Sequence, residues 1–128
     1  MPPTLRDADL KALRDTAEIQ IETWNGDERH RTTIWVVVVG NAPYVRSYRG
    51  ARGRWYREIL RQRRTVVHAG RRKIPVVAAP TKSAAINARV DRGYRDKYGG
   101  EWPNETKDML IARVKKTTLR LAPDSSAR

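Results

Sequence analysis

Hydrophobic and polar residues alternate with a period of two near the start of the chain, and this pattern predicts β-strands. Ile19 and Ile21 share one face of residues 17–23, and acidic or amide side chains share the other, which is typical of a half-buried strand. Residues 25–27, Asn-Gly-Asp, predict a turn, so we expect a hairpin with the following run. That run, residues 32–40, is apolar on both faces and predicts the most buried strand of the sheet.

The remaining pattern predicts helices and further strands. We expect helices that start near Thr4 and near Thr81 or Ser83, helices over 54–62 and 107–115, and strands over 44–48, 65–69, 74–79 and 117–123. Pro75 cannot donate to a strand ladder, so we expect its strand at a sheet edge or a bulge. The pattern therefore predicts an α+β fold of about six mainly antiparallel strands with three or four flanking helices. We expect a single domain over residues 1–123 and a disordered tail over residues 124–128.

Positive charge is concentrated in the middle of the chain. The 128 residues carry a net charge of +13, and Arg outnumbers Lys by twenty to seven. Residues 46–73 hold ten Arg and Lys73 against one acidic residue, Glu58, whereas residues 1–28 carry a local charge of −4. Such a concentration indicates an anionic partner. The codon usage of a GC-rich genome is a second explanation of the arginine excess.

Composition also narrows the class of protein. The chain contains no cysteine, which excludes disulfides, thiolate metal sites and cysteine nucleophiles and agrees with a reducing compartment. No apolar run reaches the roughly 18 residues that a membrane helix needs, and the N-terminus lacks the pattern of a signal peptide. We therefore expect a cytoplasmic protein with no membrane partner.

Familiar catalytic motifs are absent from the sequence. There is no phosphate-binding glycine loop of the Walker or dinucleotide type and no nucleophile elbow. The histidines, His30 and His68, fall in separate predicted strands with no second ligand nearby, so we expect no metal site. Glu22, Glu58 and Asp91 are most simply interpreted as partners of neighbouring arginines. No side chain is therefore predicted to be an essential acid or base.

The segment PYVRSYRGARGRWYR, residues 43–57, alternates arginines with aromatic residues and glycines. Guanidinium groups bind phosphate oxygens in pairs, and glycine lets the backbone approach an anion. A flat apolar wall could come from Trp35, Tyr48, Trp55 and Tyr56. This combination suits a nucleotide-like cofactor such as a flavin, and equally a stacked single-stranded base. Core aromatic residues beside solvent-exposed arginines would produce the same pattern.

The order of these segments resembles a known fold family. TTIWVVVVG, YVRSYRGARG, WYREIL and VVHAGRRKIPVVAAP, in this order, resemble the flavin-binding split barrels, namely the pyridoxamine phosphate oxidases and the deazaflavin-dependent reductases. Over roughly residues 5–122, the phrases TIWVV, YVRSYRG, WYRE and TTLRLAP resemble a small bacterial family catalogued as domain of unknown function 2255. The resemblance implies a split β-barrel that forms a homodimer, with a phosphate-bearing cofactor between the subunits.

The resemblance also implies particular site residues. Arg31 and Arg52 stand where the oxidases contact the cofactor phosphate, and Arg46 and Ser47 stand where they contact the flavin. We therefore expect Arg31, Arg46 and Arg52 to hold the phosphate. Gly50 and Ala51 replace a Ser and an Arg of that family's motif. The full predicted cofactor-binding set is Arg31, Arg46, Ser47, Tyr48, Arg49, Arg52 and Trp55.

The leading hypothesis from the sequence is a split-barrel protein that binds FMN or a deazaflavin. If it is an enzyme, it would be an oxidoreductase that transfers hydride to an unknown small molecule. One alternative is a non-catalytic module that binds a nucleotide or nucleic acid through residues 46–73. The other is a split barrel that has lost its cofactor.

Overall fold

The structure is a computed structural model that describes residues 3–127. Its strands are β1 (Ile19–Asn25), β2 (Glu28–Ile34), β3 (Val37–Val39), β4 (Ala42–Val45), β5 (Arg64–Ala69), β6 (Arg72–Pro80) and β7 (Leu119–Pro123). Its α-helices are α1 (Asp7–Asp15), α2 (Arg54–Gln62), α3 (Ala84–Tyr98), α4 (Pro103–Met109) and α5 (Ala112–Lys115). Two short 3-10 helices are η1 (Gly50–Arg52) and η2 (Ser125–Ala127).

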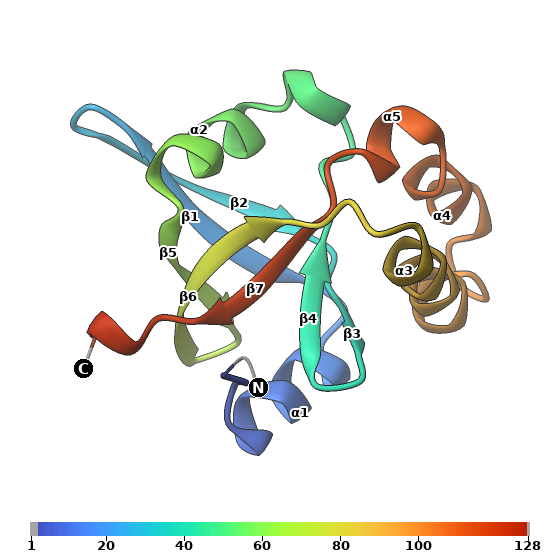
Figure 1. Ribbon diagram of the computed structural model, residues 1–128, viewed down its shortest axis with the longest axis horizontal. Helices are drawn as coiled ribbons and strands as arrows, with labels where there is room; N and C mark the ends of the chain where they lie inside the picture. Colours follow the sequence, from blue (N-terminus) through green and yellow to red (C-terminus); the bar gives the residue numbers. More distant parts are fainter. Residues whose placement is uncertain (1–2, 128) are drawn as a thin grey trace.

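The strands form one curled sheet in the order β2-β1-β5-β6-β7-β4-β3 (Figure 1). Every neighbouring pair is antiparallel. The α+β class and the antiparallel pairing predicted from the sequence are therefore confirmed. The described residues hold seven strands and five α-helices, slightly more than expected, because two of the predicted elements are each divided.

The predicted strand over residues 32–40 is wrong, because the run is divided between the two edges of the sheet. β2 ends at Ile34, β3 begins at Val37, and these two strands lie at opposite ends of the strand order. The backbone N–H of Val36 donates to the Tyr98 hydroxyl at 3.1 Å, and its carbonyl accepts from Lys97 Nζ at 2.8 Å. Because side chains of α3 satisfy these groups, the chain leaves one edge here and starts the other.

The interior position of β6 also differs from expectation. It lies between β5 and β7 rather than at an edge. The last pair of the β6–β7 ladder is Val76 with Pro123, so Pro75 lies just beyond it, and its carbonyl accepts from the Asp124 N–H at 3.2 Å. The missing N–H of Pro75 faces this same side, past the end of the ladder, where no strand partner needs it.

Helices cover both ends and one side of the curled sheet (Figure 1). α2 packs against β1 and β5, α1 packs near β3 and β4, and α3 lies along β3 with α4 and α5 beside it. One apolar cluster fills the space between the sheet, α1 and α2, and includes Leu10, Leu13, Ile59, Val67 and Leu121. A second cluster joins α3 to β3 and β4 through Val37, Tyr44, Val90, Tyr94 and Tyr98.

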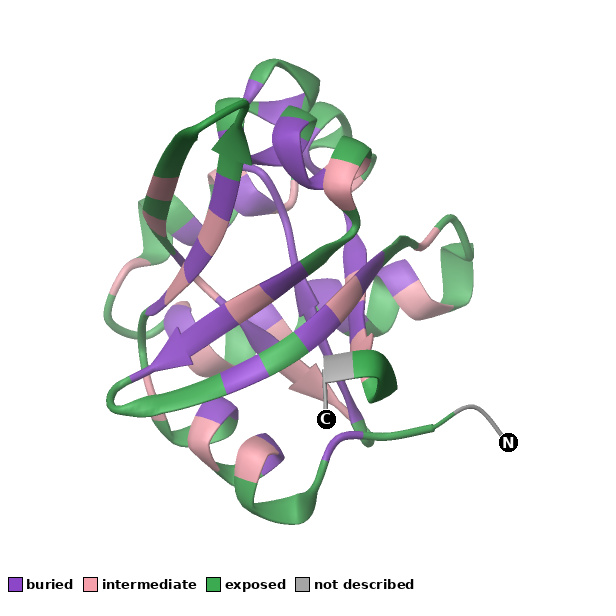
Figure 2. Cartoon of the chain, turned by 90° about the vertical axis from the view of Figure 1, so that its left-hand side faces the viewer, coloured by how far each residue is buried: buried purple, intermediate pink, exposed green. Residues whose placement is uncertain are grey.

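Burial along the elements follows the sequence pattern where that pattern was regular. β6 changes between exposed and buried residues along its length (Figure 2), with Ile74, Val76 and Ala78 on the buried face. The predicted helix over 54–62 matches α2 at both ends. The Ser83 side chain caps α3 by accepting the Ile86 N–H at 3.2 Å. Of the two helix starts predicted, Thr81 and Ser83, the second is therefore correct.

The C-terminal prediction is not tested. Residue 128 lies outside the described residues, and residues 125–127 form the short 3-10 helix η2. The tail over 124–128 and the domain boundary at 123 therefore stay predictions. Within residues 3–127, no helix has both the length and the apolar character needed to cross a membrane.

Lys97 generates a testable prediction about pH. Its ammonium group donates to the carbonyls of Leu13 and Val36, each at 2.8 Å, and burial lowers its pKa to about 8, with the Asp15 charge opposing the shift. The unfolded chain keeps the ordinary value of 10.5 and so binds this proton more strongly between pH 8 and 10.5. We expect the free energy of unfolding to rise with pH through this window.

The matched control is Lys97→Met, which lacks the titrating group. The difference in free energy of unfolding between the native chain and this variant should grow in favour of the native chain as pH rises above about 8. Urea denaturation at several pH values measures this difference. NMR titration of the Lys97 ammonium group to an ordinary lysine value would contradict the assignment.

Candidate functional site

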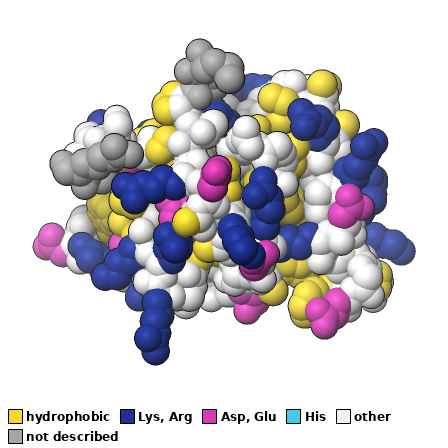
Figure 3. Space-filling view, turned by 90° about the horizontal axis from the view of Figure 1, so that it is seen from below, with side chains coloured by type: hydrophobic (Ala, Val, Ile, Leu, Met, Phe, Trp, Pro, Cys, Tyr) yellow, Lys and Arg dark blue, Asp and Glu magenta, His cyan; other side chains and the backbone are white. Residues whose placement is uncertain are grey.

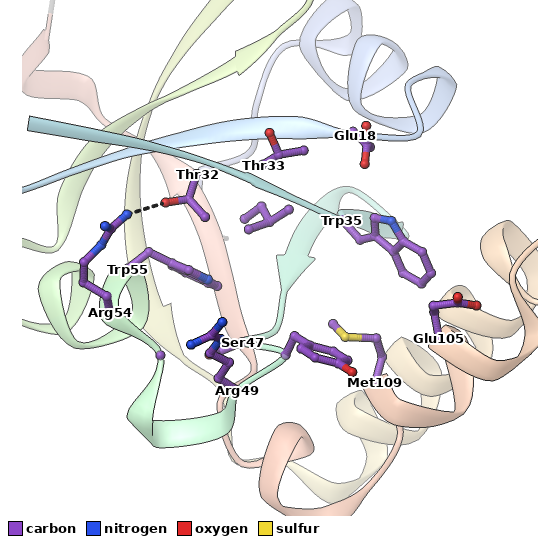
Figure 4. A pocket seen from close by; sticks show the side chains of 13 residues that line it. Glu18, Thr32, Thr33, Trp35, Ser47, Arg49, Arg54, Trp55, Glu105 and Met109 are labelled. Atoms are coloured by element: carbon purple, nitrogen blue, oxygen red, sulfur yellow. Dashed lines mark hydrogen bonds between the residues drawn. The ribbon is translucent and has the colours of Figure 1, made fainter.

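A cavity of about 560 Å³ opens between β2, the segment that follows β4, and α4 (Figure 4). β2 and the residues after it contribute Thr32, Thr33, Ile34 and Trp35. The segment from the end of β4 to the start of α2 contributes Ser47, Tyr48, Arg49, Gly53, Arg54 and Trp55. Glu18, Glu105 and Met109 complete the lining. The volume lies within the range of about 300–1,000 Å³ that small-molecule sites commonly have.

One end of the cavity is cationic. Arg49, Arg54 and Trp55 lie together at this end, with Thr32 opposite them (Figure 4). Arg54 Nη2 donates to Thr32 Oγ1 at 3.3 Å, which ties the start of α2 to β2. Neither arginine forms an ion pair within the described residues. Two guanidinium groups are therefore available to an anion in the cavity.

Arg54 also influences a buried carboxylate behind the cavity. Burial raises the pKa of the Glu58 carboxyl, but hydrogen bonds and the charges of His30 and Arg54 outweigh this effect and lower the pKa. His30 Nδ1 lies 3.1 Å from Glu58 Oε1. Glu58 is therefore a charged partner inside the fold, paired with His30 rather than with an arginine as expected, and it does not line the cavity.

The other end of the cavity is aromatic and acidic. The Trp35 indole stacks on the Tyr98 ring with a centroid distance of 3.9 Å and an interplanar angle of 1°. Glu18 and Glu105 lie at this end with Trp35 (Figure 4). Burial is the main cause that raises the pKa of Tyr98 to about 12, and the nearby Glu18 charge raises it further. The hydrogen bond with the Val36 backbone acts in the opposite direction. Tyr98 therefore stays a neutral hydroxyl behind the indole.

A tight turn presents the middle of the segment to the cavity. Ser47 Oγ donates to the Gly50 carbonyl at 2.8 Å, and the Gly50 N–H donates to the Ser47 carbonyl at 2.9 Å. Gly50 has a φ of +68°, a conformation that favours glycine. Thr117 Oγ1 accepts the Ser47 N–H at 2.8 Å, which anchors the turn near β7. Tyr48 and Arg49, inside this turn, line the cavity.

Arg46 lies inside the protein rather than in the cavity. Its side chain is 1% exposed, and its five N–H groups all have acceptors in the fold. Nη1 donates to Asp91 Oδ1 at 2.7 Å and to the Met109 carbonyl at 2.9 Å. Nε donates to Thr118 Oγ1 at 2.9 Å, and Nη2 donates to both oxygens of Asn87. No donor remains for a cofactor phosphate in this arrangement.

Asp91 neutralises Arg46 and also pairs with Lys115. Lys115 Nζ lies 2.9 Å from Asp91 Oδ2, while Arg46 contacts the other carboxylate oxygen. Burial alone would raise the pKa of Asp91, but the hydrogen bonds and charges of Lys115 and Arg46 outweigh it and lower the pKa. The stabilisation from this carboxylate is present at neutral pH and is lost as pH falls through the lowered value.

The structure brings together some of the predicted site residues and leaves others apart. Ser47, Tyr48, Arg49 and Trp55 all line the cavity. Arg31 and Arg52 are exposed and do not line it, and Arg46 is buried as described above. Trp35, which the sequence offered only as part of an aromatic wall, also lines the cavity. Arg54 was outside the predicted cofactor-binding set, and so were Gly53, Thr32, Thr33, Ile34, Met109, Glu18 and Glu105. Arg54 directly continues the arginine-rich motif, but no sequence signal marks the two residues of α4.

The basic stretch is therefore divided among several roles. Arg46 belongs to the interior, Arg49 and Arg54 to the cavity, and Arg72 pairs with Asp9 at 2.9 Å. On the face of the molecule seen from below, Lys and Arg side chains are spread between Asp, Glu and apolar groups (Figure 3).

The comparisons with known proteins identify the family and the fold. The family model described as an uncharacterised protein conserved in bacteria, DUF2255, matches residues 9–121. The chain belongs to this family. This confirms the closer of the two resemblances found in the sequence. No curated protein matches the chain.

Solved structures similar to this DUF2255 protein are split barrels. A proposed pyridoxamine 5'-phosphate oxidase from Listeria innocua is 17% identical, with a TM-score of 0.63 and 93% of each chain covered. The haem storage protein HutZ from Vibrio cholerae is 11% identical, with a TM-score of 0.66 and coverage of 93% of this chain and 90% of that one. A protein described as a domain-swapped dimer is 9% identical, with a TM-score of 0.61 and coverage of 84% and 81%. These similarities show that the predicted split-barrel fold is correct.

The residues of the cavity fit a phosphate-bearing flavin. Arg49 and Arg54 supply guanidinium donors at one end, and Trp55 and Trp35 supply flat rings. Gly53 allows the turn to close, because a Cβ there would overlap Ser47 Oγ. A group held here would be contacted by Arg49 and Arg54 rather than by Arg31, Arg46 and Arg52.

Replacing Arg46 tests its structural role. Arg46→Met should leave Asp91 buried without its guanidinium partner, and we expect the free energy of unfolding to fall by about 3–5 kcal/mol. Arg57→Ala, on the exposed side of α2, is the control and should change it by no more than about 0.5 kcal/mol. Urea denaturation measures both. A loss of under about 1 kcal/mol for Arg46→Met would show that the network is not needed.

The contact between Ser47 and Gly53 gives a double-mutant prediction. In Gly53→Ala, the new methyl group would overlap Ser47 Oγ, and we expect a loss of about 1–3 kcal/mol. Ser47→Ala removes the hydrogen bond to Gly50 and should cost about 1 kcal/mol. The double variant should lose clearly less than the sum, because the overlap is gone. Additive losses would mean that the two positions do not meet.

Proposed function

We propose that this DUF2255 protein binds FMN or a deazaflavin in the cavity between β2 and the Ser47–Trp55 segment. The observation that carries the proposal is the convergence of Arg49 and Arg54 on a cavity walled by Trp35 and Trp55. Phosphate prefers paired guanidinium donors, and a flat ring system prefers aromatic walls. The split-barrel fold, which the proposed oxidase from Listeria innocua shares, supports the same assignment.

The proposed role of each residue follows from its place. Arg49 and Arg54 bind the phosphate, Trp55 packs beside it, and the Ser47 turn holds Arg49 in position. Arg31 and Arg52 lie outside this cavity. A bound flavin supplies hydride-transfer chemistry, and the chain supplies binding and orientation. On this basis the protein is an oxidoreductase acting on a small molecule.

We further propose a homodimer, as the sequence resemblance implied. A similar fold is described as a domain-swapped dimer. The cavity is open to solvent at Tyr48, which is 57% exposed, so a second subunit could cover it. The cytoplasmic location inferred from the absence of cysteine stays a prediction.

Haem binding is the second candidate function. HutZ, which shares the fold, is a haem storage protein. Tyr48 and Met109 line the cavity, and phenolate and thioether groups are known types of haem ligand. Neither histidine lines the cavity. A haem would therefore depend on Tyr48 or Met109, whereas a flavin would depend on the two arginines.

Titration of the purified protein tests these proposals. We expect FMN or a deazaflavin to bind, and quenching of the cofactor's fluorescence measures this binding. The variants Arg49→Ala and Arg54→Ala should each weaken it by about 10- to 100-fold. Arg57→Ala removes one exposed positive charge of α2 outside the cavity and is the matched control. Arg52→Ala distinguishes the cavity from the phosphate position inferred from sequence, and it should resemble the control.

Each other result points to a different assignment. A loss of affinity in Arg52→Ala but not in Arg54→Ala would move the phosphate away from the cavity. Haem binding that depends on Tyr48 or Met109, without flavin binding, would replace the first candidate by the second. Retardation of DNA with steep salt dependence, and no cofactor binding, would favour the nucleic-acid alternative. Binding of none of these would favour a split barrel that has lost its cofactor.

A further inference from the structure

Opposite charges are separated along the cavity. Arg49 and Arg54 lie at one end, and Glu18 and Glu105 lie with Trp35 at the other (Figure 4). Glu18 directly precedes β1, and Glu105 lies in α4. Two distant parts of the chain therefore supply the acidic end. In a chain with a net charge of +13, this local pair of carboxylates opposes the overall potential.

The two carboxylates have no cationic partner of their own. Within residues 3–127, no Lys, Arg or His forms an ion pair with Glu18 or Glu105. Lys97, the residue before Tyr98, donates instead to the carbonyls of Leu13 and Val36. The acidic end therefore keeps its negative charge for a ligand.

Trp35 gives this end a rigid aromatic wall. Tyr98 covers one face of the indole at a centroid distance of 3.9 Å, and the tilted ring of Trp102 lies 6.0 Å away. Tyr98 is itself fixed, since its hydroxyl donates to the Ala17 carbonyl at 2.7 Å. The rest of the Trp35 ring lines the cavity. An indole held in this way binds a cation over its face without a loss of side-chain freedom.

We infer that the Trp35 end of the cavity binds an organic cation with an apolar body. The ammonium group would lie between the indole and the carboxylates of Glu18 and Glu105, and the body would contact Ile34 and Met109. Anions are disfavoured there by the same carboxylates. As the substrate site of an oxidoreductase, this assignment rests on the proposed function, with the cofactor phosphate at the opposite, cationic end.

A series of ligands that differ in charge tests the inference. Phenethylammonium, 2-phenylethanol and phenylacetate share a similar body and carry charges of about +1, 0 and −1 at neutral pH. NMR titration can follow the indole N–H signal of Trp35, assigned by its loss in Trp35→Phe. We expect phenethylammonium to bind about tenfold more tightly than the neutral alcohol. Phenylacetate should bind more weakly than either.

Isosteric variants show whether the two carboxylates cause the preference. Glu18→Gln and Glu105→Gln should each weaken phenethylammonium binding by about two- to fivefold and leave 2-phenylethanol unchanged. Glu101→Gln removes the same charge from an exposed residue outside the cavity, so it is the matched control. An equal loss in this control, or equal affinity for the cation and the alcohol, would overturn the inference.

The outcomes separate this inference from the proposed function. Cofactor binding that depends on Arg49 and Arg54, together with no preference for the cation, removes the cation site alone. A cation preference that depends on Glu18 and Glu105, in a protein that binds no flavin or deazaflavin, removes the cofactor proposal and keeps the cation site. Glu18→Gln and Glu105→Gln should not weaken FMN binding, because they remove negative charge from the far end.

Discussion

The buried guanidinium of Arg46 is the interaction on which the outer part of the fold depends. It joins the end of β4 to Asn87 and Asp91 of α3, to the carbonyl of Met109 in α4, and to Thr118 before β7. Removing a charged guanidinium from water is costly, and this cost is offset only when every donor is satisfied and the charge is neutralised. Asp91 meets the second condition, and the partly exposed Lys115 contacts its other oxygen. These requirements hold three helices and two strands in one arrangement.

The same interaction determines which residues face the cavity. Because Arg46 turns inward at the end of β4, the chain must turn sharply after it, and Ser47 and Gly50 close that turn with two hydrogen bonds. Tyr48 and Arg49 are then carried to the cavity by a loop whose ends are fixed. Binding groups on a loop supported by a rigid scaffold are a common arrangement, since the scaffold supplies the position that the loop lacks. The buried arginine is thus a positioning residue for its exposed neighbours.

The sequence predicted the elements whose signals are local. α2 and the start of α3 agree with expectation because glycine, a serine cap and apolar spacing define their ends. The prediction of one strand over 32–40 was wrong because a continuous apolar run fits one buried strand as well as two successive strands. The groups that divide the run, Lys97 and Tyr98, lie in a distant helix. The strand that was expected to carry the first site residues also ends earlier than predicted. The predicted strand over 44–48 would include Arg46 and Tyr48, but β4 ends at Val45, so strand alternation does not decide where these two side chains point.

The net charge of the chain and the side chains of the cavity affect different properties of ligand binding. A charge of +13 attracts any anion, but at physiological salt this attraction is screened over about 8 Å and carries little information about orientation. Groups in direct contact decide orientation, and in this cavity they differ from end to end, with guanidinium groups at one end and carboxylates at the other. A ligand with a single anionic group would therefore be held one way round. Affinity for anions in general reflects the charge of the whole surface. A fixed orientation requires the four charged side chains of the cavity, which are Arg49, Arg54, Glu18 and Glu105.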